Sequence, residues 1–109
     1  MGAAQANSDA VALLQKTAEL SPIFSRRSTD ATAARRLDPY TVVQMRKAGL
    51  LQVYVPKRFG GDELHMVDVL PSVARLARGC ASAAWVLAVY QVHNWLVAFF
   101  DNAVQKKVF

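Results

Sequence analysis

Apolar residues recur at helical spacing along the N-terminal third of the chain. A first helix is expected from Ser8 or Asp9, either of which can cap it, to Leu20. Pro22 is expected to interrupt this helix, because proline lacks a backbone N–H and its ring clashes with the preceding turn. Residues 23–36 continue with a weaker helical pattern, so this part of the chain predicts two helices.

The next two segments carry clear helix and loop signals. Asp38 and Pro39 predict an N-cap followed by proline at the first helical position, and Gly49 predicts the end of this helix after Ala48. The segment LLQVYVPKRFGG, residues 50–61, is expected to be a loop. Its proline removes a backbone donor, and its two glycines allow positive φ or a close approach of backbones.

Two further helices are expected around a long apolar stretch. The first follows residues 62–66 and runs to Gly79, with Pro71 expected in its first turn. The last begins after Asp101, which can cap the segment NAVQKKVF. Because no stop signal follows that segment, its apolar residues are expected to need a cover.

The apolar stretch GCASAAWVLAVYQVHNWLVAFF, residues 79–100, contains no formal charge. It is long enough for a membrane span, which needs about 20 apolar residues. Three polar side chains near its end oppose that interpretation, because a single span would leave Gln91, His93 and Asn94 without partners. Ser82 can instead cap a helix that is covered by neighbours on every side. We therefore expect the central helix of a bundle, with the membrane span as the alternative.

His93 is the candidate functional residue of this stretch. Its neighbours at three-, four- and seven-residue offsets are apolar or aromatic: Val86, Val89, Tyr90, Val97 and Phe100. An adjacent face carries Trp85, Val89, Val92, Leu96 and Phe99. A lone histidine in such surroundings is either a core side chain satisfied by a carbonyl or a group that faces a pocket. No second ligand occurs at metal-binding spacing, so no metal site is expected.

Composition predicts one folded domain. The chain has 109 residues, of which 53% are hydrophobic and 19% charged, too apolar a balance for disorder. Its one cysteine, Cys80, excludes an internal disulfide and favours a cytoplasmic location. Residues 1–7 have no apolar core typical of a secretory signal and are expected to form a flexible tail.

The net charge of +5 is concentrated in residues 26–58, which hold four basic pairs. A nucleic-acid interface would gather such charges on one face with aromatic residues between them, and this sequence has no recognisable module of that kind. We therefore expect solvated basic surfaces or contacts with acidic protein, and no nucleic-acid partner.

The order of three motifs resembles a known family. The motifs are AGLLQVYVPKRFGG, a helix ending in VARLARGCASAAWVL, and VHNWLVAFF. In this order they are similar to the N-terminal helical domain of the acyl-CoA dehydrogenase family, over residues 8–109. The resemblance implies an all-α fold of about five to six helices and a flavoprotein oxidoreductase.

Within that family, the segments Ser82–Trp85 and His93–Trp95 look most like the two-component flavin-dependent aromatic monooxygenases, such as the 4-hydroxyphenylacetate hydroxylase type. That likeness implies FMN or FAD bound mainly by regions outside this chain, a separate flavin reductase, an aromatic substrate and a tetrameric enzyme. It also implies that the substrate lies near His93, with Trp85 and Asn94 beside it.

Family members continue beyond the length of this chain into a β-domain and a second helical bundle. We therefore expect residues 8–109 to be the N-terminal piece of such an enzyme, truncated before the β-domain and inactive alone. Two alternatives stay open at this point. One is an acyl-CoA dehydrogenase proper that oxidises an acyl thioester, and the other is a stand-alone helical interaction module.

Overall fold

The computed structural model describes residues 3–109, with side chains from Ser8 onward. The described residues form five α-helices and two short 3-10 helices and include no strand. In chain order these are α1 (Ala3–Ala34), α2 (Pro39–Lys47), η1 (Leu50–Gln52), η2 (Lys57–Phe59), α3 (Met66–Ala77), α4 (Ala81–Val97) and α5 (Asn102–Val108). The predicted all-α class and number of helices are confirmed.

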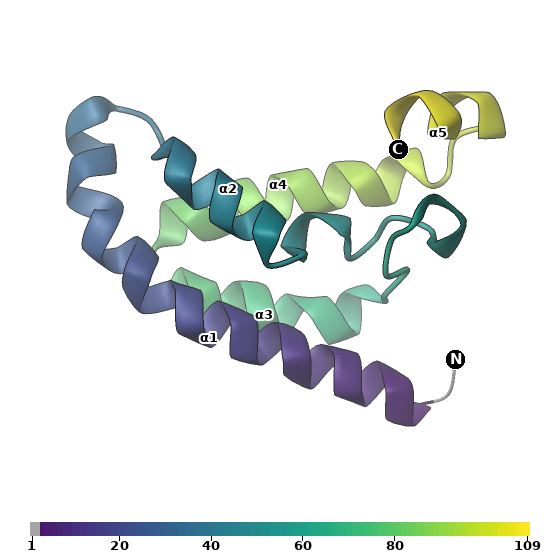
Figure 1. Ribbon diagram of the computed structural model, residues 1–109, viewed down its shortest axis with the longest axis horizontal. Coiled ribbons are helices and arrows are strands. Elements are labelled where there is room, and N and C mark those ends of the chain that lie inside the picture. Colours follow the sequence, from purple (N-terminus) through teal and green to yellow (C-terminus); the bar gives the residue numbers. More distant parts are fainter. Residues whose placement is uncertain (1–2) are drawn as a thin grey trace.

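The helix α3 lies between α1 and α4 and contacts both (Figure 1). The turn η1 joins α2 to this group through contacts with α2 and α4, and α5 packs at the far end of α4. The side chains between these elements form one core, whose largest fully buried apolar members are Phe24, Met45, Leu50, Val53, Val69, Leu76 and Leu87. This core fixes the position of α4, which carries the candidate site.

The helix α1 continues through Pro22, so the predicted interruption and the division into two helices are wrong. Figure 1 shows that α1 changes direction near its middle, as expected where a proline removes one backbone hydrogen bond. Thr17, Ser21 and Phe24, on both sides of the proline, are buried. Packing of this face against the rest of the molecule therefore keeps the chain helical on both sides of the proline.

The start of α1 also differs from the prediction. The helix begins at Ala3 rather than at Ser8 or Asp9. The flexible tail predicted for residues 1–7 therefore overlaps the helix from Ala3 on, and its first two residues lie outside the described residues.

The helix α1 ends in a turn that satisfies its last carbonyl groups. The Arg36 N–H donates to the Ala31 carbonyl at 3.2 Å, and the Arg35 N–H donates to Thr32 at 3.1 Å. This is the bonding pattern of a Schellman motif, in which Arg35 adopts φ 57° in the left-handed region that glycine usually occupies.

The predicted start of α2 is confirmed. Asp38 is the N-cap, its carboxylate accepts from the Tyr40 N–H at 3.0 Å, and Pro39 follows at the first helical position. The same carboxylate accepts from Arg27 Nε at 2.6 Å, and the Arg27 guanidinium lies 4.0 Å from the centre of the Tyr40 ring. Asp38 thus ties α1 to α2.

Asp38 should make the stability of the chain sensitive to acid. Its hydrogen bond from Arg27, then that from the Tyr40 N–H, lowers the pKa of its carboxyl below the model-peptide value of 3.8. Because the folded pKa is lowered, this stabilisation is fully present above pH 3.8 and is lost as the pH falls through the lower folded pKa. We expect Asp38→Asn, which keeps an N-cap, to melt below wild type at pH 7, and Asp38→Ala lower still. Melting curves of both variants between pH 2 and 7 test this, and a wild-type advantage over Asp38→Asn that persists at the acid end would contradict it.

Residues 50–61 form no strand, as predicted, but the expected loop contains the two short 3-10 helices η1 and η2. Gly49 and Gly60 adopt φ 76° and 85° and each ends a helical turn. Gly61 is required for another reason, because a Cβ at this position would lie 2.1 Å from the Val55 carbonyl oxygen. The loop therefore folds back on itself and contributes Leu50, Val53 and neighbouring side chains to the core.

The structure corrects the place of Pro71 and confirms the cap of α5. Pro71 is the sixth residue of α3, in its second turn rather than its first. Asp101 accepts from the Val104 N–H at 3.0 Å and caps α5 as predicted. Phe109, at the end of α5, packs against Phe59 of η2 with ring centres 5.4 Å apart.

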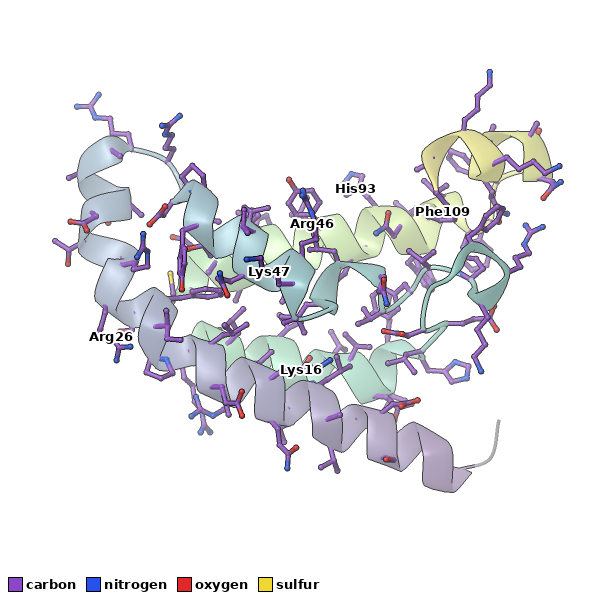
Figure 2. All side chains as sticks on the ribbon, viewed as in Figure 1. Lys16, Arg26, Arg46, Lys47, His93 and Phe109 are labelled. Carbon is purple, nitrogen blue, oxygen red and sulfur yellow. The ribbon has the colours of Figure 1, made fainter. Side chains whose placement is uncertain are left out.

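The basic side chains are distributed over several elements. Figure 2 shows Lys16 and Arg26 on α1 and Arg46 and Lys47 on α2, and all four are exposed. Arg58 is different, because it donates to Asn102 and Gln105 at 2.6 Å each and so joins η2 to α5. Within the described residues, the structure offers no helix that combines the length and the apolar character needed to cross a membrane.

Candidate functional site

The candidate site is the outer face of α4. This helix contacts α3 on one side and η1 and α5 on others, and one face remains open. The predicted central helix covered on every side is therefore wrong for this chain. The open face carries large side chains that the apolar pattern had assigned to a core: Trp85, Val89, Tyr90 and Leu96. Phe99 and Phe100 are also exposed, in the turn that follows the helix.

His93 lies within this open face, among the apolar neighbours that its spacing predicted. It is exposed, so within this chain it is not the buried core side chain that was one of the two alternatives, and Figure 2 shows it pointing away from α3. Its Nδ1 lies 2.7 Å from the Val89 carbonyl oxygen. Because a carbonyl only accepts, Nδ1 carries a proton in this contact. In the neutral ring Nε2 is then an acceptor that is free to bind a donor from outside the helix.

Trp85, predicted as a substrate contact, is 73% exposed. It borders a groove between α3 and α4 with a cavity volume of about 320 Å³. The walls of this groove are apolar and include Met66, Leu70 and Val73 of α3 and Val89 of α4. Val89 also receives the His93 hydrogen bond, so the groove and His93 adjoin on the same helix.

Asn94, the third predicted site residue, is engaged elsewhere. Its amide donates to the Leu51 carbonyl at 2.8 Å, and the buried amide of Gln91 donates to the Leu50 carbonyl at 3.0 Å. These two bonds attach η1 to α4, so the structure gives Asn94 a supporting contact. A direct contact of Asn94 with a substrate stays a prediction.

Tyr54 is a site residue that the sequence did not indicate. It lies between η1 and η2, lines the groove, and is only 6% exposed. Burial raises the pKa of its hydroxyl above the ordinary value, so the group stays protonated and able to donate near neutral pH. No local spacing connects this loop residue to α3 or α4, and so only the folded chain brings them together.

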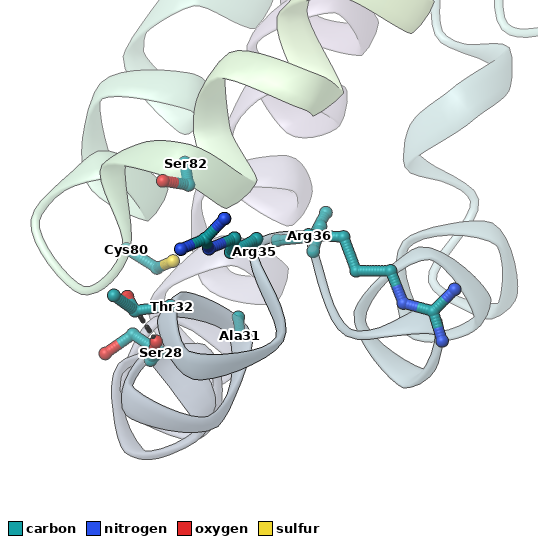
Figure 3. A pocket seen from close by; sticks show the side chains of 8 residues that line it. Ser28, Ala31, Thr32, Arg35, Arg36, Cys80 and Ser82 are labelled. Atoms are coloured by element: carbon teal, nitrogen blue, oxygen red, sulfur yellow. Dashed lines mark hydrogen bonds between the residues drawn. The ribbon is translucent and has the colours of Figure 1, made fainter.

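A second hollow lies at the start of α4 (Figure 3). It has a volume of about 290 Å³, and Figure 3 shows the Arg35 guanidinium beside Cys80 and Ser82. The N-cap of α4 is Cys80, which makes no side-chain capping bond, so the predicted cap at Ser82 is wrong. We assign no ligand to this hollow, because a helix start beside exposed arginines does not define one.

Comparison with known proteins agrees with this helical arrangement. Residues 14–109 match the family described as the acyl-CoA dehydrogenase N-terminal domain. The chain is 26% identical over 98 residues to the oxygenase component of p-hydroxyphenylacetate 3-hydroxylase from Acinetobacter baumannii. The aligned residues make up 90% of this chain and 23% of that protein. It is 31% identical over 100 residues to the flavin-dependent monooxygenase, oxygenase subunit HsaA, from Mycobacterium tuberculosis. This alignment covers 92% of this chain and 25% of HsaA.

A third relative is the oxygenase component of an FADH(2)-dependent resorcinol hydroxylase from Rhizobium, 26% identical over 98 residues, 90% of this chain and 24% of that protein. The chain thus spans about a quarter of the length of these relatives. No solved structure matches it.

Proposed function

Because the chain belongs to the acyl-CoA dehydrogenase family, we propose that it is the N-terminal part of a flavin-dependent monooxygenase that hydroxylates an aromatic substrate. In this reaction one atom of O2 enters the ring and the other leaves as water, while reduced flavin supplies two electrons. The observation that supports this proposal is the open apolar face of α4 with His93 within it. The three relatives named above, each an oxygenase component or subunit by name, support it independently.

The face of α4 has the chemistry of one wall of an aromatic pocket. Large apolar side chains favour a ring over water, and a single imidazole can fix the position of one polar substituent. Since Nδ1 of His93 is held by Val89, Nε2 is the nitrogen that would meet a phenolic hydroxyl. The neutral ring would accept from the phenol, and the protonated ring would donate to a phenolate.

The described residues of this chain offer little that could hold a flavin. Apart from His93, the polar groups of the open face of α4 are the Tyr90 hydroxyl and the Trp85 indole N–H, which are too few to meet both the polar edge and the phosphate of a flavin. We propose that FMN or FAD is bound by further parts of the complete protein, which also cover α4. Because relatives are named as oxygenase components, we propose a separate flavin reductase. The proposal also includes a tetrameric enzyme, as the family resemblance implies, and, since Cys80 is free, a cytoplasmic location.

The proposal is tested with the complete protein that contains this chain. We expect it to convert a phenolic substrate to a product with one added oxygen atom when it is supplied with chemically reduced flavin and isotopically labelled O2. Mass spectrometry should find the label in the product, and omission of flavin is the control. Formation of an unsaturated thioester from an acyl-CoA, with no phenol oxidation, would instead identify an acyl-CoA dehydrogenase. Activity with neither substrate would favour a helical interaction module.

A further inference from the structure

The groove between α3 and α4 has the properties of a ligand site. Its volume of about 320 Å³ lies within the range of small-molecule pockets, about 300–1,000 Å³. Leu70 and Trp85 are exposed at its sides, so the apolar walls of the groove continue onto the surface. An apolar ligand would remove both side chains and the inner walls of the groove from water.

Tyr54 lines this apolar groove and carries a hydroxyl. The residue is only 6% exposed, and its hydroxyl makes no hydrogen bond to any described residue. Every fully buried side-chain nitrogen or oxygen atom among the described residues has a partner. The Tyr54 hydroxyl therefore keeps some access to solvent, and Tyr54 is one of the residues that line this groove. A nearly buried donor without a partner is suited to a ligand that brings an acceptor.

We propose that this groove is a specificity subsite that holds an apolar extension of the aromatic substrate, with the Tyr54 hydroxyl donating to one acceptor oxygen on that extension. The groove adjoins His93 through Val89, so one molecule can lie along α4 with its phenolic end at His93 and its extension in the groove. The identification of this ligand as the substrate rests on the proposed function. The binding step itself needs no flavin.

Three phenols separate the contributions of size and of Tyr54. Phenol lacks an extension, 4-benzylphenol adds an apolar ring, and 4-hydroxybenzophenone adds the same ring through a carbonyl. NMR titration of the 109-residue chain can follow the indole N–H of Trp85, with the indole of Trp95 outside the groove as internal reference. We expect both larger ligands to bind at least ~10-fold more tightly than phenol and to shift Trp85 selectively. The ketone should bind more tightly than 4-benzylphenol.

Variants test the two parts of the proposal. Tyr54→Phe should weaken binding of the ketone about 5-fold and leave 4-benzylphenol within twofold of wild type. Ala88→Phe should fill the groove and abolish binding of both, and Leu70→Arg, at a more exposed position, provides the same test if Ala88→Phe does not fold. Val43→Phe, at an exposed site on α2, is the matched control and should bind like wild type.

Equal affinity for the three phenols, or equal shifts of both tryptophans, would overturn the proposal. An unchanged preference for the ketone in Tyr54→Phe would overturn the role of Tyr54. A Trp85 shift that depends on protein concentration without ligand would show that a second copy occupies the groove instead. If the complete protein binds the larger phenols selectively but oxidises no phenol, the proposed function is refuted and the binding groove is not. If it hydroxylates phenols without preferring the larger ones, only the subsite is refuted.

Discussion

Replacing Gly79 with alanine should lower the free energy of unfolding by about 3 kcal/mol or more, the upper end of the cost of overpacking. A Cβ at this position would lie 2.1 Å from the carbonyl oxygen of Ser21 and 2.2 Å from its hydroxyl. The turn from α3 to α4 thus passes directly over the backbone of α1, next to Pro22. Separating them would disturb the packing that holds α1 against α3. For a domain of this size the melting temperature should fall by roughly 15 °C.

Two variants identify the cause of this loss. Gly60→Ala meets no atom within 4 Å but has φ 85°, so it should cost only about 1 kcal/mol of conformational strain. Ser21→Ala combined with Gly79→Ala should not restore stability, because the Ser21 carbonyl oxygen remains in place. Thermal melts followed by circular dichroism measure all three. A Gly79→Ala melting temperature within a degree of wild type would mean that α1 does not pack on this turn.

Replacing His93 with alanine in the complete protein should lower the rate constant of ring hydroxylation by at least ~10-fold, and with it the yield of hydroxylated product per O2 consumed. That change equals about 1.4 kcal/mol, in the range of one hydrogen bond between an imidazole and a substrate oxygen. Oxidation of reduced flavin by O2 should proceed at an unchanged rate, because His93 acts on the aromatic ring. Single-turnover kinetics with product analysis measure both quantities.

Stability and a conservative variant distinguish this role from a packing role. His93 is exposed in this chain, so His93→Ala should change the free energy of unfolding of the 109-residue chain by less than about 0.5 kcal/mol. His93→Gln can place an amide near the position of Nε2 and should recover part of the yield. A sharp loss of stability with normal yield in the folded fraction would show that His93 is a packed side chain and that the site assignment is wrong.

Features that depend on a few neighbouring residues were predictable from the sequence. Asp38 and Asp101 cap α2 and α5 because a carboxylate can reach an N–H two or three residues later without help from the rest of the fold. Gly49 adopts positive φ because glycine has no Cβ to oppose it. The all-α class followed from the helical spacing of apolar residues between such signals.

Features that depend on long-range packing were not predictable from the sequence. Pro22 was expected to end a helix, and its local effect is real, but burial of Thr17, Ser21 and Phe24 outweighs the one hydrogen bond that proline removes. The cap of α4 could not be placed for a similar reason. Cys80 occupies it because its side chain packs in the core, although Ser82 is the better capping residue.

For the candidate site, too, some features were predictable from the sequence and others depend on long-range packing. The sequence by itself determined that His93 lies on a helix among apolar neighbours, because residues three and four apart share a helix face whatever surrounds them. Only the tertiary structure decided that this face is open and that Tyr54 adjoins it across the groove. An apolar pattern reports that a face favours burial, but it carries no information about which element covers it. That depends on contacts between residues far apart in the chain, and here α3 and η1 cover one side of α4 and leave the side of His93 free.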